Sequence, residues 1–251
     1  MELPLAERAV LVTGASSGIG RAIAIAAARA GADVAITYRA NRDGASQVER
    51  EIGALGRRSV SIHLDLADDT SIRGVGPAAR DALGRLDVWV NNAGADILTG
   101  AGASLPPLER LDLLLRVDLR GTIIASWQAV EIFDARGGAI INMSWDHVLS
   151  GMAGRNPQMF AAAKGGVLAF SKSLARSVAP RVRVNVLAPG WIETAFAAGL
   201  DEAHHREIAG STPLERWGTA DDVAGAAVFL ASPAASYLTG QTIMIGGGVV
   251  M

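Results

Sequence analysis

One short stretch, Ser144–His147, offers a hydroxyl, an indole, a carboxylate and an imidazole in consecutive residues. The apolar run Ala139–Met143 leads into it, so we expect these side chains at the end of a strand and at the mouth of a pocket. Because histidine changes protonation near neutral pH, His147 is a candidate proton donor. A lone loop histidine is often an ordinary polar residue, and this alternative stays open.

A glycine cluster near the N-terminus has the context of a nucleotide-binding turn. The apolar run Ala9–Val12 precedes TGASSGIG at Thr13–Gly20, and an alanine-rich helical stretch, Arg21–Ala30, follows. Glycines let a backbone approach a ligand closely, and a helix N-terminus offers N–H groups to a pyrophosphate. A tight strand-to-helix turn without a ligand is the alternative. The residues expected to contact a dinucleotide here are Gly14, Ser16, Ser17, Gly18, Ile19 and Gly20.

Seven apolar strand-like runs alternate with helical patterns along the chain, which predicts a doubly wound α/β fold of the Rossmann type with helices on both faces of a parallel sheet. No linker or repeat divides residues 1–251, so we expect a single domain. Leu105-Pro106-Pro107 is expected to open a long helix that ends near Ile132. The runs are Ala9–Val12, Val34–Thr37, Val60–Leu64, Val88–Val90, Ala139–Met143, Val182–Val186 and Thr242–Ile245.

Motifs follow several of these runs at the sheet edge where α/β proteins bind ligands. They are TGxxxGIG from Thr13, NNAG from Asn91, a helix carrying Lys164, and PGxxxT from Pro189. In this order they resemble the short-chain dehydrogenase/reductase family over essentially the whole chain. The resemblance implies an NAD(P)-dependent oxidoreductase with a small-molecule substrate. It also implies that the insertion-like segment 195–214, which contains Phe196, is a mobile lid over the substrate.

The resemblance carries further cofactor contacts onto matching positions. Asn91, Ala93 and Gly94 match the loop beneath the adenosine ribose and nicotinamide, and Ile192 with Thr194 matches the positions that hold the carboxamide. Asp65 would accept from the adenine amine, although it could instead cap the following helix. The remaining expected cofactor contacts are Leu66, Lys164, Pro189 and Gly190.

The end of the second strand favours NADP(H) over NAD(H). A ribose without a 2′-phosphate is usually held there by an acidic residue, and this strand ends Thr37-Tyr38-Arg39-Ala40-Asn41-Arg42 without one. Arg39 and Arg42 could pair with the phosphate through charge-assisted hydrogen bonds. Solvated surface arginines are the alternative.

The catalytic half departs from the family pattern. In that pattern a Tyr and a Lys four residues apart share one helix face, and here Lys164 is present while Phe160 takes the tyrosine position. Ser144 follows its strand as the family serine does, but sixteen positions separate it from Phe160, a few more than usual. The residues expected to line the substrate pocket are Trp145, Asp146, Phe160 and Trp191, with Met152 and Met159.

Asp118 stands where the family more often has an asparagine. It shares a helical face with Leu111, Leu114 and Leu115, and a carboxylate on an apolar face is costly unless it is paired. Lys164 or a bound water is its expected partner. A surface salt bridge to Arg116 or Arg120 is the alternative.

Three functions fit this mixture. Phe160, Asp118 and Lys164 together resemble the 2,4-dienoyl-CoA reductase branch, so reduction of a conjugated C=C bond or an activated carbonyl in a small apolar substrate is the first. Lys164, Ser144 and ordered water could then stabilise the enolate charge. The second is a carbonyl reductase or alcohol dehydrogenase that uses His147 or Asp146 as its acid. The third is a catalytically inactive NADP-binding subunit.

Bulk composition excludes several other classes. The 23 basic and 25 acidic residues give a net charge of −2 without a basic run, which argues against nucleic acid as a partner. The chain has no cysteine, and its four histidines lack metal-ligand spacing, so we expect neither a disulfide nor a bound metal. No apolar span has the length of a membrane helix, and a cytoplasmic protein is expected. The C-terminal segment Gly240–Gly248 resembles the family's edge-strand interface, which implies a homotetramer.

Overall fold

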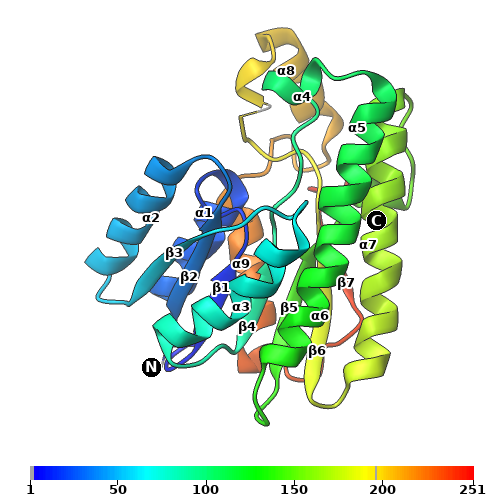
Figure 1. Cartoon of the computed structure of the whole chain (residues 1–251). Helices are drawn as coiled ribbons and strands as arrows, with labels where there is room; N and C mark the ends of the chain where they lie inside the picture. The colour runs from blue at the N-terminus through cyan, green and yellow to red at the C-terminus, as the bar shows by residue number, and fades with distance from the viewer. Residues whose placement is uncertain (1–2, 196) are drawn as a thin grey trace.

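The chain folds around one parallel sheet of seven strands in the order β3-β2-β1-β4-β5-β6-β7 (Figure 1). This is a computed structural model, and it describes residues 3–195 and 197–251. The predicted doubly wound fold is confirmed. The strands are β1 (Ala9–Val12), β2 (Asp33–Tyr38), β3 (Ser59–His63), β4 (Val88–Asn91), β5 (Gly138–Met143), β6 (Val182–Pro189) and β7 (Thr242–Ile245).

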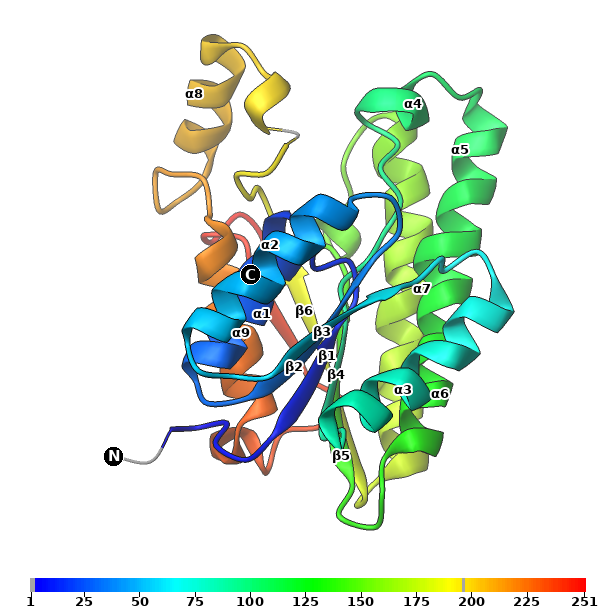
Figure 2. The ribbon, with the colours of Figure 1, turned by 60° about the vertical axis from the view of Figure 1, so that its left-hand side comes forward.

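Helices cover both faces of the sheet, which is why the central strands read as continuous apolar runs. On one face, α1 (Gly18–Arg29), α2 (Arg42–Ala54) and α9 (Ala220–Ala231) enclose one hydrophobic core (Figure 2). On the other face, α3 (Asp69–Leu83), α6 (Thr122–Ile132) and α7 (Arg155–Val178) enclose a second. The order of the strands reverses between β1 and β4, and that switch point is where such sheets bind ligands.

The long helix expected to end near Ile132 is interrupted. It consists of α5 (Pro107–Leu114), a π-helical segment η1 (Leu115–Gly121) and α6. In a π-helix the backbone hydrogen bonds join residues five apart instead of four, so its side chains point in other directions than in an α-helix. Such segments often occur at functional sites. Asp118 lies in the middle of η1.

Short elements rise above the carboxyl ends of the strands. They are α4 (Gly100–Ala103), the 3-10 turns η2 (Asp146–Val148) and η3 (Ala197–Gly199), and α8 (Glu202–Ser211), and α4 and α8 stand at the top of Figures 1 and 2. A further 3-10 turn, η4 (Pro233–Ala235), follows α9. The segment predicted as a lid thus contains η3 and α8, and its Phe196 lies outside the described residues. The Trp217 indole donates to the His205 carbonyl at 3.0 Å and ties α8 to the loop that follows it.

Candidate active site

The glycine turn after β1 has the geometry that close ligand approach requires. Gly14 has φ +64° and Gly18 has φ +56°, conformations that glycine adopts without strain. A Cβ on Gly14 would lie 2.8 Å from the Cα of Ala93, so the turn also packs directly on the loop after β4. Ser17 is the N-cap residue of α1, and it offers no side-chain cap hydrogen bond, so the first N–H groups of α1 remain available to a ligand.

A hollow of about 650 Å³ opens beside this turn, across the carboxyl ends of β1, β2, β3 and β4. A dinucleotide fits its chemistry, because it joins a glycine turn at a helix N-terminus to polar groups at the adjacent strand ends. Among the predicted cofactor residues, it is lined by Gly14, Ser16, Ser17, Arg39, Asp65, Leu66, Ala93 and Gly94.

The structure separates the two arginines at the end of β2. Arg39 lines the hollow together with Tyr38 and Asn41. Arg42 is the first residue of α2 and is exposed outside the lining. Of the two arginines, Arg39 is therefore the one that lines the hollow.

Asp65 is not a helix cap. Its carboxylate accepts from the Ala67 backbone N–H at 2.8 Å in the loop after β3, and Asp68 caps α3 instead by accepting from Thr70. Because it lines the hollow, Asp65 is available for the predicted contact with an adenine amine.

Asn91 does not line the hollow, contrary to the prediction. It is 3% exposed, its amide donates to Ser126 and Asn142, and its oxygen accepts from the Trp89 indole at 2.8 Å. It therefore braces the interior between β4, β5 and α6.

Asn92, which the sequence analysis did not single out, faces the nucleotide-binding turn. Its amide donates to the carbonyls of Thr13 at 2.9 Å and Gly14 at 3.2 Å, and it lines the hollow. Its backbone N–H and that of Ala93 both donate to the Thr13 hydroxyl at 3.0 Å. The Asn-Asn repeat after a strand was the signal that could have identified it, because adjacent residues of a strand point to opposite sides.

Lys164 and Asp118 form an ion pair, and of the two partners expected for this carboxylate, Lys164 or a bound water, it is Lys164 that the structure places beside it. Lys164 Nζ lies 2.9 Å from Asp118 Oδ2, with the carboxylate side chain 2% exposed and the amine 12% exposed. The other oxygen of Asp118 accepts from the Ala95 backbone N–H at 2.7 Å, which ties the pair to the loop after β4. Lys164 Nζ also donates to the Met143 carbonyl at 3.4 Å. The alternative partner Arg120 instead pairs with Asp69 on the surface.

Ser144 is held on α7 rather than presented as a free donor. Its hydroxyl donates to the Lys164 backbone carbonyl at 2.9 Å, and the residue is 6% exposed. The helix carrying Lys164 is thereby fixed to the end of β5. The prediction that Ser144 steadies substrate charge therefore needs this hydrogen bond to be shared or exchanged.

Asp146 and His147 form a second polar pair, on the 3-10 turn after β5. His147 Nδ1 lies 2.6 Å from Asp146 Oδ1, and the same oxygen accepts from the His147 backbone N–H at 2.7 Å. Among the described residues Asp146 is the only hydrogen-bond partner of the ring, so Nε2 remains available to a substrate. A carboxylate on one ring nitrogen fixes the orientation of the imidazole and the position of its protons.

Asp146 is not a substrate contact, contrary to the prediction, because it is fully buried. Its Oδ2 has no hydrogen-bond partner among the described residues and lies where a Cβ on Gly190 or Gly246 would come within 2.3 Å. Only glycine at both positions leaves room for the carboxylate. Gly190, expected to contact the cofactor, is thus also required for the placement of Asp146.

Aromatic rings surround this histidine. Trp145 stacks on His147 at a centroid distance of 5.0 Å and lies 6.2 Å from Phe160, and Trp191 meets the imidazole edge to face at 6.1 Å. Trp217, not singled out from the sequence, continues the row with Trp191 at 5.8 Å. We call Trp145, Phe160, Trp191 and Trp217 the aromatic wall; that it contacts a substrate stays a prediction.

The two methionines expected to line the substrate pocket differ in burial. Met159 is buried in a small core with Ile97 and Leu114, whereas Met152 is 39% exposed.

The loop after β6 completes the site. Pro189 ends β6, Gly190 donates its N–H to Ile245 at 3.0 Å, and Ile192 forms an isolated parallel bridge with Gly218. Thr194 follows on the same loop and is half-buried. These contacts hold the loop against the end of β7, where the predicted carboxamide contacts would be made.

In the part of the chain that the structure describes, no three His, Asp or Glu side chains converge as metal ligands, and no helix has the length and apolar character needed to cross a membrane.

Known proteins are similar to this chain in sequence and architecture. A family profile described as Enoyl-(Acyl carrier protein) reductase matches residues 14–250. An uncharacterized oxidoreductase of Methylorubrum extorquens is 36% identical over 252 residues, which cover 96% of this chain and 97% of the relative. The 3-oxoacyl-(acyl-carrier-protein) reductase FabG of Staphylococcus aureus is 35% identical over 247 residues, covering 97% and 98%.

A solved structure agrees with these matches. A short chain dehydrogenase from Burkholderia cenocepacia in complex with NADP gives a TM-score of 0.88 at 35% identity, covering 98% of this chain and 99% of that one. The chain therefore belongs to the short-chain dehydrogenase/reductase family and is an NAD(P)-dependent oxidoreductase.

Proposed function

We propose that this enzyme is an NADPH-dependent reductase of a conjugated C=C bond or an activated carbonyl in a small apolar substrate. The observation that carries the proposal is the pairing of Lys164 with buried Asp118 one helical turn from Phe160, within an aromatic wall. The ion pair of the site is formed, and Phe160, four residues before the lysine, has no ionisable proton to donate.

When bound, the nicotinamide cofactor would supply a hydride. Lys164 would hold the ribose next to the nicotinamide, with Asp118 keeping the ammonium group in place at 2.9 Å. Ile192 and Thr194 would hold the carboxamide, as their matching family positions imply.

The absence of a phenol at position 160 favours a substrate whose charge spreads away from the reacting carbon. Hydride addition to a conjugated alkene creates an enolate delocalised over several atoms, which water can protonate at a distance. In the reduction of a simple carbonyl, the oxygen on the carbon that receives the hydride must itself be protonated. Loss of the general acid then lowers the rate by about 10²–10⁴-fold. This argument and the pattern of Phe160, Asp118 and Lys164 support the likeness to 2,4-dienoyl-CoA reductases.

NADP(H) is the proposed cofactor because Arg39, and no acidic side chain, lines the hollow at the end of β2. Bound NADP in the Burkholderia cenocepacia structure supports this choice. Arg39→Ala should narrow the preference for NADPH over NADH by about 10- to 100-fold, the loss expected when charge-assisted hydrogen bonds to a phosphate disappear. Nicotinamide fluorescence titrations with both cofactors measure it.

Arg42→Ala is the matched control, because Arg42 lies outside the lining of the hollow, and it should leave the preference unchanged. An unchanged preference in Arg39→Ala, or tighter binding of NADH by the unmodified protein, would contradict this assignment.

A second candidate is a carbonyl reductase or alcohol dehydrogenase with His147 as the acid. The observation that favours it is the hydrogen bond between His147 Nδ1 and the buried carboxylate of Asp146, which leaves Nε2 available beside Trp191. Asp146 would position the imidazole rather than donate the proton itself, since it is fully buried.

Restoring the phenol tests how much of the site follows the family pattern. Phe160→Tyr adds one hydroxyl on the helix face of Lys164, and we expect it to create or raise NADPH-dependent reduction of small activated ketones by about tenfold or more. Steady-state rates with a panel of ketones measure it. If the unmodified enzyme already reduces ketones efficiently and the variant loses that activity, Phe160 is a packing residue and the acid lies elsewhere.

A turnover screen of enones, enoyl thioesters and simple ketones with NADPH tests the proposed function directly. Consumption of NADPH with the first two classes and not the third supports alkene reduction, while efficient turnover of simple ketones supports the second candidate. Binding of NADPH without turnover of any class would support a catalytically inactive NADP-binding subunit. The homotetramer and the cytoplasmic location remain proposals, and β7, the edge strand of the sheet, would supply the subunit contact.

A further inference from the structure

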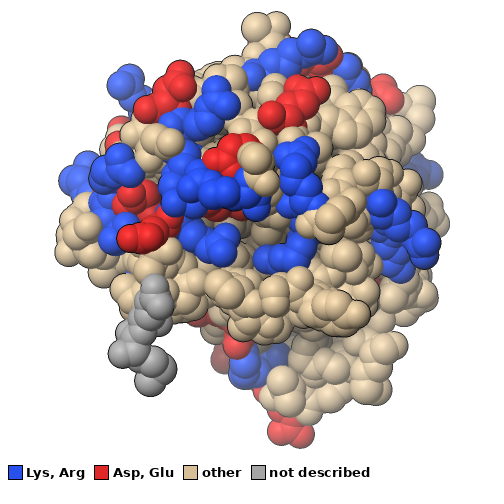
Figure 3. Space-filling model, turned by 90° about the horizontal axis from the view of Figure 1, so that it is seen from below, with Lys and Arg blue, Asp and Glu red and all other residues tan. Residues whose placement is uncertain are grey.

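The opposite edge of the sheet, where the strands begin, carries a separate hollow of about 470 Å³. It is formed by the segments that lead into β1, β4, β5 and β6 and by the turn after α9. Figure 3 views the molecule from this side and shows Lys and Arg side chains gathered across the middle of the face, between smaller acidic areas. The arginines that line the hollow are Arg8, Arg85, Arg136, Arg181 and Arg183.

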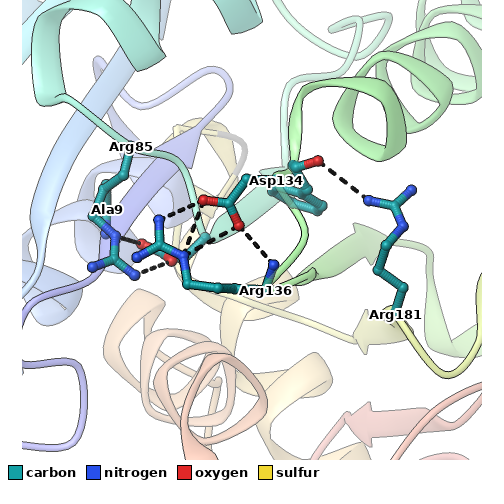
Figure 4. Close-up of polar contacts among 7 residues, drawn as sticks. Ala9, Arg85, Asp134, Arg136 and Arg181 are labelled. Carbon is teal, nitrogen blue, oxygen red and sulfur yellow. Dashed lines mark hydrogen bonds and ion pairs between the residues drawn. The ribbon is translucent and has the colours of Figure 1, made fainter.

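Two of these arginines are already paired with carboxylates. Arg85 Nε lies 2.7 Å from Asp87, a buried residue that also accepts from the Ala9 backbone N–H at 2.8 Å. Arg136 Nε lies 3.0 Å from Asp134. Figure 4 shows these two pairs next to each other, with the dashed contacts closing each pair. Their charges are therefore compensated within the protein.

The other three arginines have no carboxylate partner within ion-pair distance among the described residues. Arg183 donates to the carbonyls of Leu230 at 2.9 Å and Leu238 at 3.4 Å. Arg181 donates to the carbonyls of Phe133 at 3.2 Å, as drawn in Figure 4, and Val130 at 2.9 Å. Backbone carbonyls orient a guanidinium group but do not neutralise its charge.

Arg8 is the least engaged of the three. Its side chain is half-buried and forms no hydrogen bond or ion pair with any described residue. Burial lowers the pKa of Arg183, and the neighbouring charge of Arg8 lowers it further. The positive charges of Arg8 and Arg183 therefore repel each other beside a partly buried hollow, and this arrangement costs free energy unless an anion is present. Glu7 also lines the hollow, but it is exposed and pairs with none of these arginines among the described contacts.

We propose that this hollow binds a small oxyanion of the phosphate or polyphosphate class, held by Arg8 and Arg183 with Arg181 at the rim. The planar fork of a guanidinium group matches two oxygens of a phosphate, and a partly buried site strengthens such charge-assisted bonds. The site lies at the amino ends of the strands, whereas the cofactor hollow lies at their carboxyl ends. It is therefore independent of the proposed reaction.

Calorimetric titration of the full chain with inorganic pyrophosphate at low ionic strength tests the site. Arg8→Gln should weaken pyrophosphate binding by about tenfold or more, the effect of removing one charge-assisted contact. This variant should not lower the melting temperature, because the Arg8 side chain forms no hydrogen bond or ion pair with a described residue and its charge opposes that of Arg183. Arg183→Lys should also weaken binding, since a lysine cannot offer the same two-pronged contact.

Saturating NADPH and Arg206→Gln are the controls. Pyrophosphate could also bind the glycine turn at the N-terminus of α1, so the titration is repeated with NADPH occupying the cofactor hollow. Arg206 is an exposed arginine of α8 paired with Glu202. Neither condition should weaken the pyrophosphate binding that depends on Arg8. The proposal is overturned if the unmodified protein gives no binding, or if Arg8→Gln in its folded state binds pyrophosphate as the unmodified protein does.

Discussion

Asp118→Ala should lower the free energy of unfolding by about 3–5 kcal/mol, because it removes one partner of a buried ion pair and leaves the ammonium group of Lys164 without its counter-charge. The carboxylate is 2% exposed and also accepts from the Ala95 N–H, so the variant loses two contacts at once. Turnover should fall about tenfold or more as Lys164 loses its fixed position. Denaturant unfolding and steady-state kinetics measure the two effects separately.

Asp69→Ala is a matched control for this change. Asp69 pairs with Arg120, which lies on the same π-helical segment as Asp118, but both side chains of that pair are exposed. Exposed ion pairs contribute little, so neither stability nor turnover should change measurably. Asp118→Asn should fall between the two, because the amide oxygen can still accept from Ala95. Equal effects of Asp118→Ala and Asp69→Ala would mean that the buried pair has no special role.

His147→Gln should reduce turnover of a carbonyl substrate by about 10²–10⁴-fold, since the glutamine amide can fill the space but cannot donate a proton as an acid. With a conjugated alkene the loss should stay below about tenfold, because the enolate can take its proton from water. Asp146→Asn should produce a smaller loss with the carbonyl substrate, through misorientation of the imidazole. Parallel kinetics with an enone and an activated ketone provide the comparison.

His204→Gln controls for the general effect of removing a histidine bonded to a carboxylate. His204 Nδ1 lies 2.8 Å from Asp201 on the surface of α8, in a pair of the same kind as His147 and Asp146. The hydrogen bond to Asp201 raises the pKa of His204, yet the residue is exposed and does not line the cofactor hollow. Turnover should be unaffected. A His147 variant that reduces ketones at the unmodified rate would remove the second candidate function.

The strands and the glycine turn could be predicted from the sequence because their signals are local. Buried parallel strands require continuous apolar runs, and the turn after β1 requires glycine at Gly14 and Gly18. The pairing of Asp118 with Lys164 was one of the arrangements expected, since a carboxylate among leucines needs a partner and Lys164 or a bound water was the expected one, with Arg116 or Arg120 as the alternative.

Asn91 shows where this reasoning fails. Asn91 and Asn92 differ by one position, and adjacent residues in extended backbone point to opposite sides. The sequence could not fix at which residue β4 ends. The strand includes Asn91, whose side chain turns into the interior, and Asn92 becomes the residue at the glycine turn.

The prediction that Asp146 contacts the substrate is wrong for a different reason, because the residue is fully buried. Its burial depends on two glycines, Gly190 and Gly246, that are distant in the sequence and approach only when β6 and β7 lie side by side. Local pattern gives no account of such a contact. The π-helical segment around Asp118 could not be predicted from the sequence either, because its residues are equally compatible with an α-helix.

Gly246, the residue directly after β7, packs against the carboxylate of Asp146 and so helps to position His147, the candidate acid. The residues after Ile245 therefore set how much room the carboxylate has, although they lie far along the chain from His147. A fusion partner attached at the C-terminus would strain this loop, which follows the carboxyl end of β7, whereas the first described residues lead into the amino end of β1, at the opposite edge of the sheet. Affinity tags for kinetic work on this enzyme belong at the N-terminus, and kinetic constants measured with C-terminal fusions should be compared with those of the untagged chain.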